Sequence, residues 1–196
     1  MKKQLYILIT ILVCISFIGT GCGSAENKSK TADTANKSST ETKAEFGQVT
    51  KEQKEAGIKF VKDLTKTLVK YLDEDKNIEN ELESIEKIED PSERLAKKYD
   101  SAIRRYNLAV KYYKKFDEFS TAGMDQINAL LAEQCRINAQ QIMQCRVDEA
   151  ELAAKTLSGE SPKEKFESEF EHLKGLEKRY YADYKSNVTS LTKELQ

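Results

Sequence analysis

The chain has 196 residues, with 32 basic and 33 acidic side chains, one histidine and no tryptophan. A balance this close to neutrality excludes a generally basic nucleic-acid-binding protein. A third of the residues are charged, whereas only 8 are Gly and 2 are Pro, which is typical of long exposed helices.

The first segment of the chain has the pattern of a bacterial signal peptide. Lys2 and Lys3 precede an apolar stretch over residues 5–18, which is shorter than the roughly 20 residues that a membrane-spanning helix needs. The motif Gly19-Thr20-Gly21-Cys22 follows. This motif resembles the lipobox of bacterial lipoproteins, although Gly19 stands where Leu is usual.

The resemblance implies that residues 1–21 are removed by cleavage between Gly21 and Cys22. It also implies that the Cys22 thiol, a strong nucleophile, carries a diacylglyceryl group built from fatty acids such as palmitate. The protein would then be anchored by its lipid at the outer face of the cytoplasmic membrane. The abundance of Lys, Glu and Asn suggests a Gram-positive source. The alternative is an ordinary secretory signal with an accidental cysteine.

Residues 22–45 are predicted to be the lipidated cysteine followed by a disordered linker. After Cys22 the segment contains no large apolar side chain, so it cannot bury enough surface to offset its ordering entropy. As a flexible coil its ends would average ~26 Å apart. Phe46 is the first bulky apolar residue after it, and one domain is expected over residues 46–196.

Start signals and apolar spacing predict helices in this domain. Capping oxygens three residues before Glu or Gln occur at Thr50, Asp90 and Ser161, and the two prolines, Pro91 and Pro162, follow two of them. The first helix is expected from Thr50 to about Glu89. Its apolar series is Val61, Leu64, Leu68, Tyr71, Asp75, Ile78, Leu82 and Ile85, in which Asp75 is the one polar member.

The same spacing of three and four residues continues in the later segments. In the second expected helix, after Pro91, the apolar series is Leu95, Tyr99, Ala102, Tyr106, Ala109, Tyr113 and Phe116. In the third it is Met124, Ile127, Leu131, Cys135, Asn138, Ile142 and Cys145. In the fourth, after Pro162, it is Phe166, Phe170, Leu173, Glu177, Tyr180, Tyr184, Asn187 and Leu191. Ser158-Gly159 is a plausible end for the third helix.

These signals predict an all-α fold, an elongated antiparallel bundle of four long helices that resembles a coiled coil. The segment Ser120-Thr121-Ala122-Gly123 could be a turn or only a weak point within one helix. A bundle of three helices, with the second and third continuous, is therefore the alternative.

Few residues of the domain offer chemistry. Cys135 and Cys145 lie ten residues apart on one expected helix, ~15 Å in rise, which is too far for a disulfide. They are interpreted as small buried apolar side chains, with a redox-active or intermolecular thiol as the alternative. His172 follows Glu169 at the spacing used in di-iron bundles, but one histidine cannot complete such a site. We expect no metal and no cofactor.

Tyr112 and Tyr181 lie off the apolar series and are the candidate aromatic residues for binding a partner. No catalytic constellation is visible, so the protein is expected not to be an enzyme. The expected function is a non-catalytic binding or structural module at the cell envelope, with an unknown protein, peptide or cell-wall partner. The alternative is a protective lipoprotein that captures a bacteriocin, toxin or phage component.

Overall fold

The structure is a computed structural model that describes residues 49–196. The expected signal peptide, Cys22 and linker lie outside the described residues and stay predictions. The described residues form four helices and no strand: α2 (Lys51–Ile85), α3 (Pro91–Asp117), α4 (Gln126–Leu157) and α5 (Lys163–Glu194). The predicted all-α bundle with four long helices is confirmed.

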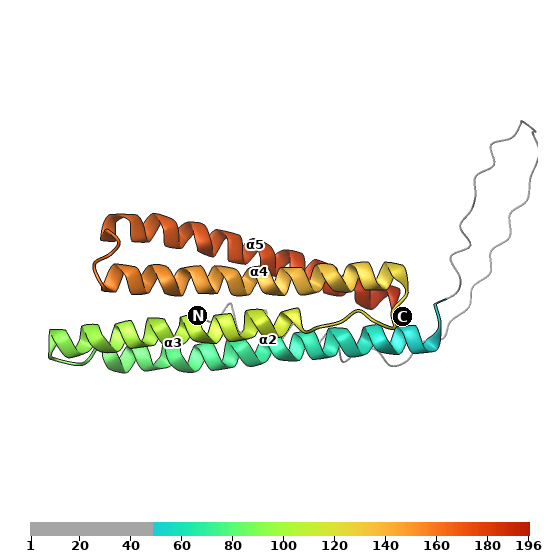
Figure 1. Ribbon diagram of the computed structural model, residues 1–196, viewed down its shortest axis with the longest axis horizontal. Helices are drawn as coiled ribbons and strands as arrows, with labels where there is room; N and C mark the ends of the chain where they lie inside the picture. The colour runs from blue at the N-terminus through green and yellow to red at the C-terminus, as the bar shows by residue number, and fades with distance from the viewer. Residues whose placement is uncertain (1–48) are drawn as a thin grey trace, which may run out of the picture. The chain divides into compact units, whose positions relative to one another are not determined.

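Successive helices of this unit run antiparallel and lie side by side along their length (Figure 1). Helix α4 packs against both α3 and α5, whereas α2 packs chiefly against α3. The unit Val49–Gln196 is compact and its hydrophobic core is built from its own residues. It therefore has the contacts that a domain needs to fold by itself.

The helix starts follow the predicted capping residues in two of three cases. The backbone N–H of Gln53 donates to Thr50 Oγ1 over 3.2 Å and that of Thr50 donates to Gln53 Oε1 over 2.8 Å, which completes a capping box. Asp90 accepts from the backbone N–H of Ser92, and Pro91 is the first helical residue.

The predicted cap at Ser161 is wrong. Helix α5 begins at Lys163, one residue later than expected, and Pro162 is its N-cap with no side-chain hydrogen bond. Ser161 lies in the connection after α4, where its backbone N–H donates to the carbonyl oxygen of Lys155 over 3.0 Å.

The alternative bundle with three helices is wrong, because the chain leaves the helical conformation between Asp117 and Gln126. Gly123 in this connection has φ +84°, a left-handed conformation that glycine adopts at little cost. Asp125 then caps α4 by accepting from the backbone N–H groups of Ile127 and Asn128. Gly159, with φ +81°, ends α4 at the predicted position.

The apolar face is predicted well for α2 and poorly for α3. On α3 the predicted members Leu95, Tyr99 and Tyr113 are 47%, 41% and 38% exposed, whereas Tyr112 is 1% exposed. Tyr112 and Tyr113 both lie three or four residues from Ala109 and from Phe116, so heptad spacing could not distinguish them. The other predicted members that are buried include Leu64, Leu68, Tyr71, Cys135, Ile142, Tyr184 and Leu191.

Every helix of residues 51–194 carries charged side chains along its length. None of the helices in the part of the chain that the structure describes has the length and apolar content to cross a membrane.

Candidate functional site

Six charged side chains meet inside the bundle, and we call them the charged cluster. They come from all four helices: Asp75 of α2, Arg105 of α3, Arg146 and Glu149 of α4, and Lys174 and Glu177 of α5. The three carboxylates are each only 5% exposed. Three positive charges face three negative charges, so the cluster is balanced when all six groups are ionised.

The contacts link the helices pairwise. Arg105 of α3 donates two hydrogen bonds to Asp75 of α2, from Nε to Oδ1 over 2.7 Å and from Nη2 to Oδ2 over 2.9 Å. Lys174 of α5 donates to Glu149 of α4 over 2.9 Å and to Glu177 over 3.3 Å. Bidentate and charge-assisted hydrogen bonds of this kind fix both the distance between two helices and their relative orientation.

Arg146 lies at the centre of the cluster. Its Nη1 is 3.7 Å from Asp75 and 3.5 Å from Glu149, and its Nε is 2.6 Å from Glu177 Oε1. The Nε contact is an ion pair without hydrogen-bond alignment, because neither of its two atoms has a hydrogen-bond partner among the described residues. Arg146 is therefore held by charge in three directions rather than by directed hydrogen bonds.

Burial shapes the electrostatics of the cluster. Burial by itself lowers the pKa of Arg146, but Glu177 and Glu149 outweigh it and the pKa lies above its ordinary value. Burial raises the pKa of Glu149 although Arg146 and Lys174 oppose the shift. Because each buried charge has an opposite charge in contact, the cluster can fix the positions of the helices.

The predicted exposed aromatic residues are not exposed. Tyr112 packs its ring against that of Tyr71, with centroids 5.4 Å apart, and its hydroxyl donates to Glu74 Oε1 over 2.8 Å. Tyr181 is partly buried, and its hydroxyl is inside the bundle without a hydrogen-bond partner in residues 49–196. The interpretation of Tyr112 and Tyr181 as an exposed aromatic platform is therefore wrong.

Cys135 and Cys145 are free and buried, at 0% and 4% exposure. Burial raises the pKa of the Cys135 thiol to about 12 and that of the Cys145 thiol to about 11. The thiolate is the reactive form of cysteine, so both thiols are expected to be unreactive in the folded protein.

Two surface hollows flank the C-terminal part of α4. The α4–α5 hollow has a volume of about 430 Å³ and is lined by Asp148, Glu151, Leu152, Lys155, Ser161, Ser168, Glu169, His172 and Leu173. The α3–α4 hollow has a volume of about 190 Å³ and is lined by Tyr99, Ile103, Tyr106, Glu151, Ala154, Lys155, Ser158 and Glu160.

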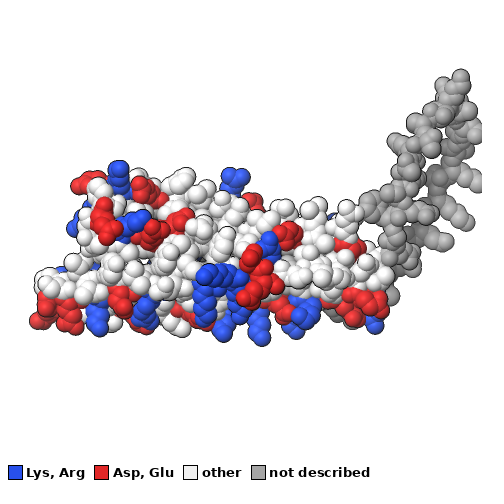
Figure 2. Space-filling model, in the orientation of Figure 1, with Lys and Arg blue, Asp and Glu red and all other residues white. Residues whose placement is uncertain are grey.

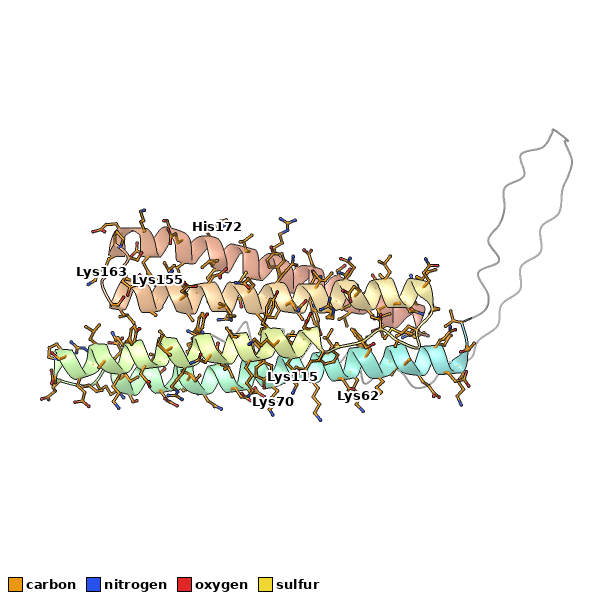
Figure 3. All side chains as sticks on the ribbon, in the orientation of Figure 1. Lys62, Lys70, Lys115, Lys155, Lys163 and His172 are labelled. Atoms are coloured by element: carbon orange, nitrogen blue, oxygen red, sulfur yellow. The ribbon has the colours of Figure 1, made fainter. Side chains whose placement is uncertain are left out.

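Glu151 and Lys155 line both hollows and form an ion pair with each other. We call this pair the α4 ridge, because it lines the α3–α4 hollow together with Tyr99 and Tyr106 and the α4–α5 hollow together with His172. Figure 3 labels Lys155 on α4 and His172 on α5. His172 is exposed, and no group of three potential ligands in residues 49–196 is placed to hold a metal ion. Both hollows are open to solvent.

Sequence reasoning missed these hollows because it assigned Tyr99 and Tyr106 to a covered apolar face. It did carry a signal for the charged cluster, since Asp75 and Glu177 were polar members of apolar series. A carboxylate in such a series indicates a buried charge that needs a partner.

Comparison of the chain with protein-family models, with curated proteins and with solved structures finds no match.

Proposed function

We propose that this chain is a lipoprotein tethered to the outer face of the cytoplasmic membrane, and that its helical unit is a non-catalytic binding module. The observation that carries the binding role is the pair of hollows on the two sides of the α4 ridge. The tether rests on the lipobox-like motif ending in Cys22.

The α3 side of the ridge leaves apolar surface uncovered. Tyr99 is 41% exposed and Leu95, one turn earlier on α3, is 47% exposed. Tyrosine beside a hollow supplies contact area and a polar tip at low entropic cost, and such side chains are enriched among the residues that dominate binding energy. Tyr99 thus takes the role first assigned to Tyr112 and Tyr181.

The state of the carboxylates supports binding rather than catalysis. Those best shielded from water, Asp75, Glu149 and Glu177, contact arginine and lysine inside the bundle. A carboxyl group that is buried and paired with a cation cannot reach a substrate as a general acid or base. Of the carboxylates that line the hollows, Glu151 is paired with Lys155 on the same helix, whereas Asp148, Glu160 and Glu169 form no ion pair within residues 49–196.

The tether is tested by replacing Cys22 with Ala in the producing cell. The variant should accumulate as uncut precursor and take up no fatty-acid analogue, because the acylated thiol is absent. The same analysis of a Cys145→Ala variant, which removes a buried thiol of the helical unit, should show normal labelling. Labelling of the Cys22→Ala protein would overturn the lipoprotein assignment.

The binding role is tested by placing a photoreactive phenylalanine analogue at Tyr99 in intact cells. Tyr113 is the matched control, since it lies on the same helix and is 38% exposed but lines neither hollow. The Tyr99 position should give a discrete cross-linked adduct that the Tyr113 position does not give. Identical adducts from both positions, or none from either, would contradict a binding surface at the hollows.

The lining of the hollows favours one second candidate, the capture of a cationic peptide toxin. Asp148, Glu151, Glu160 and Glu169 face a single lysine, Lys155, so the surface attracts positive charge. Cells lacking the protein should then be more sensitive to a cationic bacteriocin-like peptide, and a Glu160→Gln, Glu169→Gln variant should restore less protection than the parent chain. Unchanged sensitivity would remove this candidate.

A further inference from the structure

Helix α2 carries a run of lysines along its outer side. Lys59, Lys62, Lys66 and Lys70 follow one another at steps of three and four residues, and all four side chains are exposed. This spacing places them in one row on a single helix face, away from the buried face that contains Leu64 and Leu68.

Lysines of α3 extend this row across the neighbouring helix. Lys111, Lys114 and Lys115 are exposed, and the Lys111 ammonium lies 3.5 Å from Glu74, which also lies 3.8 Å from Lys70. We call the seven lysines together the basic face. Figure 2 shows basic side chains gathered at the middle of the α2–α3 edge, and Figure 3 places Lys62, Lys70 and Lys115 there.

The basic face is set against an otherwise acidic unit. The two segments that contain the basic face, residues 59–74 and 111–115, carry seven basic and three acidic side chains, which gives a net charge of +4. The other described residues carry 19 basic and 26 acidic side chains, which gives a net charge of −7. The unit therefore presents opposite potentials on different parts of its surface, and the α2–α3 edge attracts anions while the hollows do not.

Helix stability does not explain this row. Lys62, Lys66 and Lys70 place like charges four residues apart, an arrangement that weakens a helix. Only the first and last lysines of the row form ion pairs that offset this repulsion, Lys59 with Asp63 and Lys70 with Glu74. A solvated face selected for helix stability would alternate the signs of charge at this spacing, as Lys51 and Glu55 do.

We infer that the basic face docks the helical unit onto the anionic lipid surface of the membrane. This inference rests on the proposed lipid tether. The linker joins the unit at α2, and Lys59 lies only about two helical turns beyond the first residue, Lys51. A charged face so near a lipid-anchored segment adds a second, electrostatic attachment to the first. The side of the unit with the acidic hollows is then left for a partner.

Vesicle co-sedimentation tests this attachment without the lipid. The unlipidated chain, residues 23–196, is mixed at about 10 mM salt, where charges act over ~30 Å, with vesicles of equal phosphatidylglycerol and phosphatidylcholine. It should bind these vesicles, should not bind pure phosphatidylcholine vesicles, and should be released as salt is raised. Replacing Lys62, Lys66 and Lys70 by Glu should weaken binding by at least about tenfold, given the attraction per lysine.

The matched control is a Lys163→Glu, Lys178→Glu, Lys185→Glu variant. These lysines of α5 are exposed and form no ion pair within residues 49–196, and their replacement changes the net charge by the same amount. The control should bind close to the parent level. Equal weakening by the two variants would mean that only net charge matters, and would overturn the inference.

Two further results keep the test decisive. Lys66→Glu alone should raise the melting temperature slightly, because Lys62 and Lys70 become opposite-charge neighbours whereas Asp63 alone becomes a like-charge neighbour, and should still weaken vesicle binding. If the chain bound a soluble glycerol-phosphate polymer but not the anionic vesicles, the face would be assigned to a wall polymer and the lipid inference would be wrong. Because these experiments use no lipid anchor, a failed Cys22 experiment would show separately that the tether is wrong.

Discussion

The helical unit contains two zones that share one sequence pattern but differ in burial. The packed zone comprises residues 60–78, 101–116, 128–154 and 177–195 and holds almost all buried side chains. The distal zone comprises residues 79–100 and 155–176, in which Ile85 alone is buried. Apolar residues recur at three- and four-residue steps in both zones. Periodicity therefore predicts which side of a helix is apolar, and packing decides whether that side is covered.

The charged cluster lies where the two zones meet. Asp75, Arg105, Glu149 and Glu177 are each within six residues of a distal segment. The apolar core thus ends in a layer of balanced charges, and the two hollows lie across this boundary, lined by residues of both zones. We interpret the packed zone as the source of stability and the distal zone as the surface available to a partner.

The largest effect is expected from Arg146→Met. The change leaves Glu177 and Glu149 without their central cation, and removing one member of a buried ion pair costs about 3–5 kcal/mol. Chemical denaturation should show a correspondingly lower free energy of unfolding. Arg179→Met is the control, because Arg179 pairs with Asp183 over 3.9 Å at the surface. The denaturation midpoint of this variant should stay close to that of the parent. An equal loss of stability in the two variants would contradict a structural role of the charged cluster.

The next effect contrasts one leucine from each zone. Leu64 is 0% exposed and Leu95 is 47% exposed. Leu64→Ala should lower the free energy of unfolding by about 2–5 kcal/mol, because it opens a cavity in the core. Leu95→Ala should lower it by less than about 1 kcal/mol. Thermal denaturation of the two variants measures the difference, and a large loss for Leu95→Ala would show that the distal zone is covered in solution.

A smaller effect with a pH signature is expected at the start of α4. Burial tends to raise the pKa of Asp125, but hydrogen bonds from Asn128 and Ile127 lower it below its ordinary value. Asp125→Ala should cost about 1 kcal/mol at neutral pH. A depressed folded pKa gives stability that is complete above the unfolded pKa of about 4 and is lost as pH falls through the folded pKa. The difference in the free energy of unfolding between parent and variant, measured by urea unfolding, should therefore disappear at acidic pH. A gap that does not depend on pH would contradict the cap.

The smallest effect concerns the thiols of the packed zone. Cys135 and Cys145 should stay free and react slowly with an alkylating reagent at neutral pH, since their raised pKa values leave almost no thiolate. Denaturant should make both react at the rate of an ordinary cysteine. Mass spectrometry that found fast native alkylation, or a bridge between them, would mean that α4 opens between residues 135 and 145.

The sequence indicated where most of the helices begin and end, because capping residues and glycines act locally, but it left open whether the second and third helices are continuous. The Thr50 capping box and the turn at Gly159 depend on a few neighbouring residues, and both formed as expected. The start of α5 shows the limit of this reasoning, since the helix begins at Lys163 after Pro162 and without the cap predicted at Ser161.

The candidate site could not be predicted in the same way, because it depends on which faces meet. Heptad spacing admits both Tyr112 and Tyr113, and the contact of Tyr112 with Tyr71 and Glu74 selects the first. Tyr99 has the same spacing but lies where α3 and α4 leave a hollow. The balanced contacts of Arg146 join three helices and are not encoded in any single segment.

Amide hydrogen exchange of residues 49–196 tests the division into two zones most directly. Amides around Leu64 in α2 and Ile142 in α4 should exchange only through global unfolding, because they lie in the packed core. Amides of α5 between residues 165 and 173 should exchange at least about tenfold faster through local opening, because no side chain there is fully covered. Equal protection along the whole of α5 would contradict the account, since it would mean that the distal zone is as firmly held as the core.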